Sequence, residues 1–242
     1  MRTEGQANAL RELGAGAVVA DLRGDVEWTA NGCEAAIFAA GARHRPDLGA
    51  IDAGGAAKFA EAADRYDHSR FILCSVIGAH APERRSGGVR EFLAAKQHAE
   101  RRLVRLDMQW SILRFGRLTE QPGSGHVDVE IHDGTRLEIS RDDAALAVVD
   151  ALVRSHLARR VVHLVDGERS IASALDSIEP PPLPQAPVNP GSLGEAQADN
   201  PPDAANMIAP DAAPLDADVD WVGDGPVPRE PVGNEDPAPG IP

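Results

Sequence analysis

The sequence predicts an α/β protein with a doubly wound parallel sheet over residues 1–178. Short apolar runs alternate with stretches in which apolar residues recur about every 3.6 positions, and this alternation is typical of βαβ units. The apolar runs are unbroken, as buried parallel strands tend to be. Composition changes sharply after residue 178, because 16 of the 19 prolines follow it. We therefore divide the chain into a domain, 1–178, and a tail, 179–242.

Five apolar runs are predicted strands: 16–22, 35–41, 70–78, 110–116 and 160–167. The predicted helices between them are 52–66, 89–106 and 140–157. Ser140 is the expected N-cap of the last helix, and the acids that follow it suit the exposed amides of a first turn. An Asp-Gly pair between two alternating runs predicts a hairpin over 126–140.

The tail, 179–242, is predicted to be disordered, acidic and proline-rich. It holds 12 acidic residues and one basic residue, Arg229, whereas the domain has 26 acidic and 23 basic residues. Such a composition buries too little apolar surface to offset the entropy lost on ordering. Trp221 and Val222 form its apolar island, which is either a docking motif for a protein partner or an isolated pair of hydrophobes in a solvating segment.

Several classes of function are not supported by the sequence. The domain has no concentrated basic face, which argues against a nucleic-acid partner. No apolar run reaches about 18 residues and no leader precedes the domain, so we expect no membrane partner. Cys33 and Cys74 do not form a disulfide framework, which favours a cytoplasmic location. The scattered histidines lack the spacing of metal ligands.

The carboxyl ends of the predicted strands carry candidate ligand-binding residues, since doubly wound sheets bind ligands there. Asp21 ends the first strand, Gly41 ends the second, and Ser75 lies near the end of the third. A glycine lets a flat ligand approach the backbone, and a serine hydroxyl can donate to a carbonyl or alkoxide oxygen. Taken singly, these residues are equally well explained as turn or strand-end residues. Their serial order, followed by Lys96, favours a site.

That order of short motifs resembles the atypical short-chain dehydrogenase/reductase family, and more closely its NmrA-like and NAD-dependent epimerase-like proteins. The motifs include "AGAVVADL", "EAAIFAAG", "RFILCSVIGAH", "REFLAAKQHAE" and "WSILRFGRLTE", within residues 2–178. The resemblance implies a Rossmann-like fold that binds NADP or NAD and an unknown small-molecule substrate.

The family's cofactor-binding and catalytic roles can be transferred position by position. The resemblance places Arg2 at the adenosine-side phosphate, and Asp21 and Leu22 beside the adenine. It places Ala39, Ala40, Gly41 and Lys96 at the ribose. It places Phe115, Gly116 and Leu118 near the nicotinamide. A guanidinium such as that of Arg2 meets phosphate oxygens with two donors at once. Ser75 and Lys96 match the catalytic serine and lysine, although the neighbouring Val76 also aligns with a serine in many members.

Phe92 occupies the place of the tyrosine in the Tyr-x-x-x-Lys motif of the family. Phenylalanine has no proton to transfer, and losing a general acid typically slows a reaction by about two to four orders of magnitude. Phe92 also continues an apolar helical stripe with Ala95, Ala99 and Leu103, so it is expected to pack in the core. The two interpretations are compatible, and together they predict impaired catalysis.

The glycine-rich turn of the family is a second departure. Gly-x-x-Gly-x-x-Gly normally follows the first strand and cradles the pyrophosphate with backbone amides, but the chain resembles the family only from just after its second strand. An N-terminally truncated domain with weak NAD(P) binding is therefore expected. Three functions stay open: an oxidoreductase or epimerase with impaired catalysis, a non-catalytic nucleotide-sensing or regulatory module, and a degenerate remnant.

Overall fold

The computed structural model describes residues 2–132 and 134–180, so the predicted disorder of the tail beyond residue 180 lies outside the described residues. The helices are α1 (Glu4–Glu12), α2 (Gly54–Arg65), α3 (Gly87–Leu103), α4 (Arg141–Leu152) and α5 (Ile171–Asp176). The strands are β1 (Ala35–Phe38), β2 (Arg70–Val76), β3 (Trp110–Phe115), β4 (Arg117–Thr119), β5 (His126–Asp128), β6 (Glu138–Ser140), β7 (Arg160–Asp166) and β8 (Arg169–Ser170). No described helix is long and apolar enough to cross a membrane.

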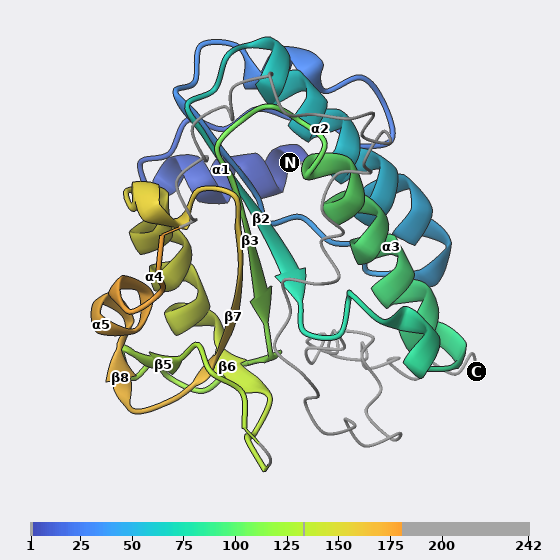
Figure 1. The fold of residues 1–242 in the computed structure, drawn as a ribbon. Coiled ribbons are helices and arrows are strands. Elements are labelled where there is room, and N and C mark those ends of the chain that lie inside the picture. The colour runs from blue at the N-terminus through green and yellow to red at the C-terminus, as the bar shows by residue number, and fades with distance from the viewer. Residues whose placement is uncertain (1, 133, 181–242) are drawn as a thin grey trace, which may run out of the picture.

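A mostly parallel sheet with helices on both faces confirms the predicted fold class. Its strand order is β1-β2-β3-β7-β5-β8, and the pairs β1–β2, β2–β3 and β3–β7 are parallel. The antiparallel strands β5 and β8 complete one edge. Helices α2 and α3 cover one face of the sheet, and α4 and α5 cover the other (Figure 1).

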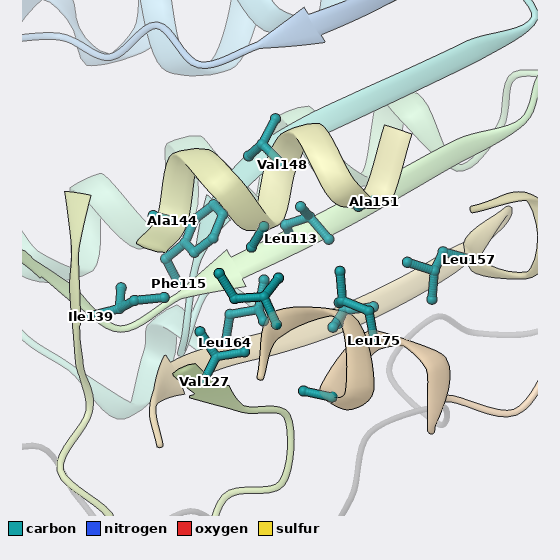
Figure 2. Close-up of a cluster of buried hydrophobic side chains, with 14 of the residues drawn as sticks. Leu113, Phe115, Val127, Ile139, Ala144, Val148, Ala151, Leu157, Leu164 and Leu175 are labelled. Atoms are coloured by element: carbon teal, nitrogen blue, oxygen red, sulfur yellow. The ribbon is translucent and has the colours of Figure 1, made fainter. Parts of the chain in front are cut away.

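Two apolar clusters hold these layers together. The cluster beneath α2 and α3 includes Phe38, Phe71 and Trp110. The cluster on the other face gathers side chains from β3, β7 and α4, including Leu113, Leu164 and others labelled in Figure 2. Side chains of a strand alternate between the two faces, so each of the central strands β2, β3 and β7 supplies both clusters.

Two predicted elements differ from the structure. Residues 16–22 form no strand, and the carbonyl of Ala17 accepts from the Arg11 side chain at 2.7 Å. The predicted hairpin over 126–140 is also wrong. Its first half, β5, pairs with β7 and β8, whereas its second half, β6, pairs with β4. Both errors arise because strand pairing depends on neighbours distant in the sequence.

The predicted cap of α4 is confirmed, and a buried arginine secures the other end of this helix. The Ser140 hydroxyl accepts from the Asp143 amide at 2.9 Å. At the C-terminal end, the Arg70 guanidinium donates to the backbone carbonyls of Ala151 and Arg154 at 3.2 and 3.3 Å. The same carbonyls also accept backbone amides, Ala151 from Arg154 and Arg154 from Leu157, each at 3.2 Å. Arg70 therefore ties α4 to the start of β2.

Gly116 follows β3 at a point where another segment approaches very closely. A Cβ atom there would lie 2.6 Å from the carbonyl carbon of Leu137, and the obstacle is backbone. We expect Gly116→Ala to lower the free energy of unfolding by about 1–3 kcal/mol, the usual cost of overpacking. Gly5→Ala is the control, because nothing lies within 4 Å of its Cβ position in α1 and alanine favours helix. Urea denaturation measures both; equal stability of the two variants would contradict the close approach.

Candidate functional site

Three polar side chains form a row across the middle of the sheet. Ser75 of β2 is in register with Arg114 of β3, and Arg114 is in register with His163 of β7. In-register residues of neighbouring strands point to the same face. Here that is the face covered by α3. Ser75 and Arg114 are buried, with 6% and 3% of their surface exposed.

Glu100 of α3 binds two members of this row. Its Oε1 accepts from the Ser75 hydroxyl at 2.5 Å and from Arg114 Nε at 3.0 Å, and its Oε2 accepts from Arg114 Nη2 at 2.6 Å. The carboxylate and guanidinium thus form a two-pronged pair shielded from solvent. Since the Ser75 proton is donated to Glu100, the serine oxygen has only acceptor capacity left.

Lys96 lies one turn before Glu100 on α3 and is held by a buried carboxylate. Its Nζ lies 2.9 Å from Oδ1 of Asp52, a fully buried residue in the π-helical turn Gly49–Ala53. The other carboxylate oxygen accepts from the Ala42 amide at 2.8 Å. Asp52 therefore links the lysine of α3 to the segment that follows β1, where exposed Ala39, Ala40 and Gly41 lie.

Phe92 lies one turn before Lys96, and its surroundings are apolar. It is half-buried and packs against a small cluster that includes Val76 and Leu93. The Lys96 ammonium lies 5.8 Å from the centre of its ring. The core packing predicted for Phe92 holds in part, because the ring joins this cluster and not the one that contains Ala99 and Leu103. No hydroxyl stands at either position, 76 or 92, where the family resemblance places one.

The residues predicted for the adenine end lie near the start of α2. Leu22 packs closely against Gly55, since a Cβ atom added to Gly55 would lie 3.1 Å from the Cβ of Leu22. The Leu22 carbonyl accepts from the Lys58 ammonium at 2.8 Å. The Arg23 guanidinium, by its hydrogen bonds, lowers the pKa of Asp21 to about 2. The charge of Arg2 adds a smaller lowering of the same pKa.

The three residues predicted for the nicotinamide end lie in different surroundings. Phe115 is buried, and its ring lies against α4, on the face of the sheet opposite Lys96 (Figure 2). Gly116 is pressed against the backbone of Leu137, as described above. Leu118, in β4, is 38% exposed. Structural roles account for Phe115 and Gly116, and their contact with a cofactor stays a prediction.

Sequence reasoning missed Asp52, Glu100, Arg114, His80 and His163. A signal existed for three of them. Asp52 is an acid in an otherwise apolar stretch before a helix, Glu100 lies four residues after Lys96 on the buried face of its helix, and Arg114 interrupts an apolar strand. Charged residues in such positions are rarely buried unless paired, which would have suggested partners for each.

The buried pair of Glu100 and Arg114 should carry much more stability than an exposed pair on the same helix. Glu100→Gln leaves Arg114 buried without a counterion, and we expect a loss of about 3–5 kcal/mol in the free energy of unfolding. Glu91→Gln breaks the exposed pair with Arg45 and should cost about 0–1 kcal/mol. Chemical denaturation of both variants measures the difference. Similar losses would show that burial does not govern the strength of the pair.

Comparisons with known proteins bear on the family and the fold of the chain. The family model described as NAD(P)H-binding matches residues 1–155. A Bacillus subtilis protein named as an uncharacterized sugar epimerase, YhfK, is 34% identical over 184 residues, which cover 74% of this chain and 86% of that protein. A putative NAD-dependent epimerase/dehydratase from Bacillus halodurans is 29% identical, with a TM-score of 0.68 and coverage of 74% and 86%.

A second solved structure is also similar. The oxidoreductase YlbE from Lactococcus lactis is 26% identical, with a TM-score of 0.60, and the match covers 66% of this chain and 76% of that one. The family match spans more than half of the chain, and the relatives share its sheet and helices. The chain therefore belongs to the NAD(P)H-binding family, with relatives that are named as epimerases or epimerase/dehydratases.

Proposed function

We propose that the chain binds NADP or NAD at the carboxyl ends of β1 and β2, with Lys96 directed to the ribose hydroxyls. The observation that carries this proposal is the chain of contacts from Lys96 through Asp52 to the Ala42 amide. It places a buried ammonium beside the exposed segment 39–41, the two features that the family resemblance assigns to the ribose. Asp52 would act as a positioning residue that fixes the lysine before the ligand arrives.

The residues fit part of a dinucleotide. Gly41 is exposed after the strand end, and a Cβ there would make ordinary van der Waals contact with Asp52 Oδ1 at 3.6 Å. Arg2, whose charge contributes to lowering the pKa of Asp21, offers a cation for the adenosine-side phosphate. Gly54 and Gly55 begin α2, and Gly87 and Gly88 begin α3, but the Gly-x-x-Gly-x-x-Gly spacing of the family does not occur among residues 2–132 and 134–180, so the proposal assigns no residue to the pyrophosphate. The proposal thus covers the ribose and adenine ends.

The chemistry that fits best is that of an oxidoreductase or epimerase with impaired catalysis. A bound nicotinamide supplies or accepts a hydride. The residues around Lys96 are poorly suited to move the accompanying proton, because Phe92 has no hydroxyl and the Ser75 proton is already donated to Glu100. An acceptor-only serine can still orient a substrate hydroxyl.

A non-catalytic nucleotide-sensing or regulatory module is the second candidate, and the apolar cluster of Val76 and Phe92 favours it. Such a module needs the ribose contacts but no general acid. The acidic tail, 179–242, would then serve as an arm for a protein partner, in keeping with a cytoplasmic regulator.

Removing the lysine together with its carboxylate tests cofactor binding without leaving a buried charge unpaired. We expect Asp52→Asn/Lys96→Met to weaken NADPH or NADH binding about tenfold or more, equivalent to about 1.4 kcal/mol. Arg101→Met, an exposed cation on the same helix, is the control. Calorimetric titration with each dinucleotide measures the affinities. Undiminished binding by the double variant would contradict the proposed role of Lys96.

Restoring the hydroxyl separates the enzyme from the sensor. Phe92→Tyr places a phenol beside the Lys96 ammonium, which favours the ionised phenol and so lowers its pKa. For an enzyme limited by the missing acid, we expect turnover with a panel of aldehydes and ketones to rise by about two to four orders of magnitude. Dinucleotide affinity serves as the internal reference. Unchanged turnover at unchanged affinity would favour the non-catalytic module.

A further inference from the structure

Three buried side-chain nitrogen atoms, one of them on Arg114, make no hydrogen bond in the site described above. They are Arg114 Nη1, His163 Nε2 and His80 Nδ1, and each is shut off from solvent without a hydrogen-bond partner in the described part of the chain. Arg114 itself is 3% exposed. Buried polar nitrogens are costly when left unpaired, at about 1–3 kcal/mol each. Three in one neighbourhood therefore indicate a polar guest.

The three nitrogens come from neighbouring elements. Arg114 and His163 are in register on β3 and β7. His80 follows β2, and its backbone carbonyl accepts from Gln97 of α3 at 2.9 Å. The charge of Arg114 lowers the pKa of both histidines, after the larger effect of burial, and His80 also acts on His163. The register makes Arg114 and His163 neighbours on the sheet, and the bond from Gln97 holds the backbone of His80 to the helix that carries Glu100.

We propose that Arg114, His80 and His163 form a binding site for a small carboxylate, either a free monocarboxylate or the carboxylate end of a larger ligand. A carboxylate offers two oxygen acceptors, and charge-assisted bonds to a guanidinium are among the strong hydrogen bonds in proteins. Glu100 already occupies Nε and Nη2 of Arg114, so the remaining nitrogen and the two imidazoles are left for the guest. A phosphate dianion would bring more charge than this site balances.

Binding at this site should be coupled to proton uptake. Burial, followed by Arg114, lowers the pKa of His163 to about 4, so the imidazole is neutral near pH 7. The pKa of His80 is also lowered, first by burial and then by the charge of Arg114, whereas the charge of Glu100 raises it. Arg84 lowers this pKa further and Glu83 raises it. A bound anion favours protonated imidazole and raises both pKa values. By linkage, the anion binds more tightly as the pH falls towards about 4, the pKa of His163 without the anion.

Sodium formate is a suitable probe, titrated into the full chain with 15N-labelled histidine and followed by NMR. We expect formate to raise the pKa of His163 saturably by about one unit or more, which corresponds to at least tenfold tighter binding to the protonated form. The His80 signals should shift over the same formate range. No dinucleotide is needed, so the result is independent of the proposed NAD(P) site.

Variants locate the effect. His163→Phe should abolish the formate-dependent shift of His80, whereas His98→Phe, at an exposed position of α3, should leave it intact. If His163→Phe fails to fold, the titration of the unaltered chain still decides the outcome. A pKa of His163 that does not respond to formate up to about 100 mM would overturn the proposal and indicate that water alone satisfies the three nitrogens.

Discussion

The buried ion pair between Glu100 and Arg114 fixes the position of α3 on the sheet. It joins the helix to β3, and the bond from Ser75 extends the connection to β2. Sliding the helix would leave a charge unpaired in the core, which costs several kcal/mol. Because Phe92, Lys96 and Glu100 follow one another at intervals of four residues, they share one face of α3. Anchoring Glu100 therefore also fixes where Phe92 and Lys96 lie relative to the ends of the strands.

Asp52 supplies a second restraint, which acts on the direction of the lysine. A free lysine side chain samples many rotamers, whereas the Lys96 ammonium is held beside a fully buried carboxylate. The π-helical turn before α2 presents that carboxylate, and the Ala42 amide holds its other oxygen. Segments from β1, α2 and α3 thus meet at one point, although they are far apart in the sequence.

Much of the fold was predictable because β1, β2, β3 and β7 are buried parallel strands with long apolar runs. Residues 16–22 carry the same pattern but join no described sheet, and a strand is defined by its partner as much as by its residues. The site follows the same rule. Lys96 stood out by its motif, whereas the pairings of Asp52 and of Glu100 with Arg114 depend on register and helix placement, which a local pattern does not contain.

The features that would bind and those that would catalyse are built separately in this site. The binding features are charged, satisfied in advance by Asp52, and need no change when a ligand arrives. Of the two hydroxyls that the family resemblance assigns to proton transfer, Phe92 lacks one, and the hydroxyl of Ser75 donates its hydrogen to Glu100. A single Phe92→Tyr change would restore one hydroxyl without disturbing Asp52, because the ring already lies beside Lys96. Ser75 is different, since its proton is held in a buried hydrogen bond to the same carboxylate that pairs with Arg114.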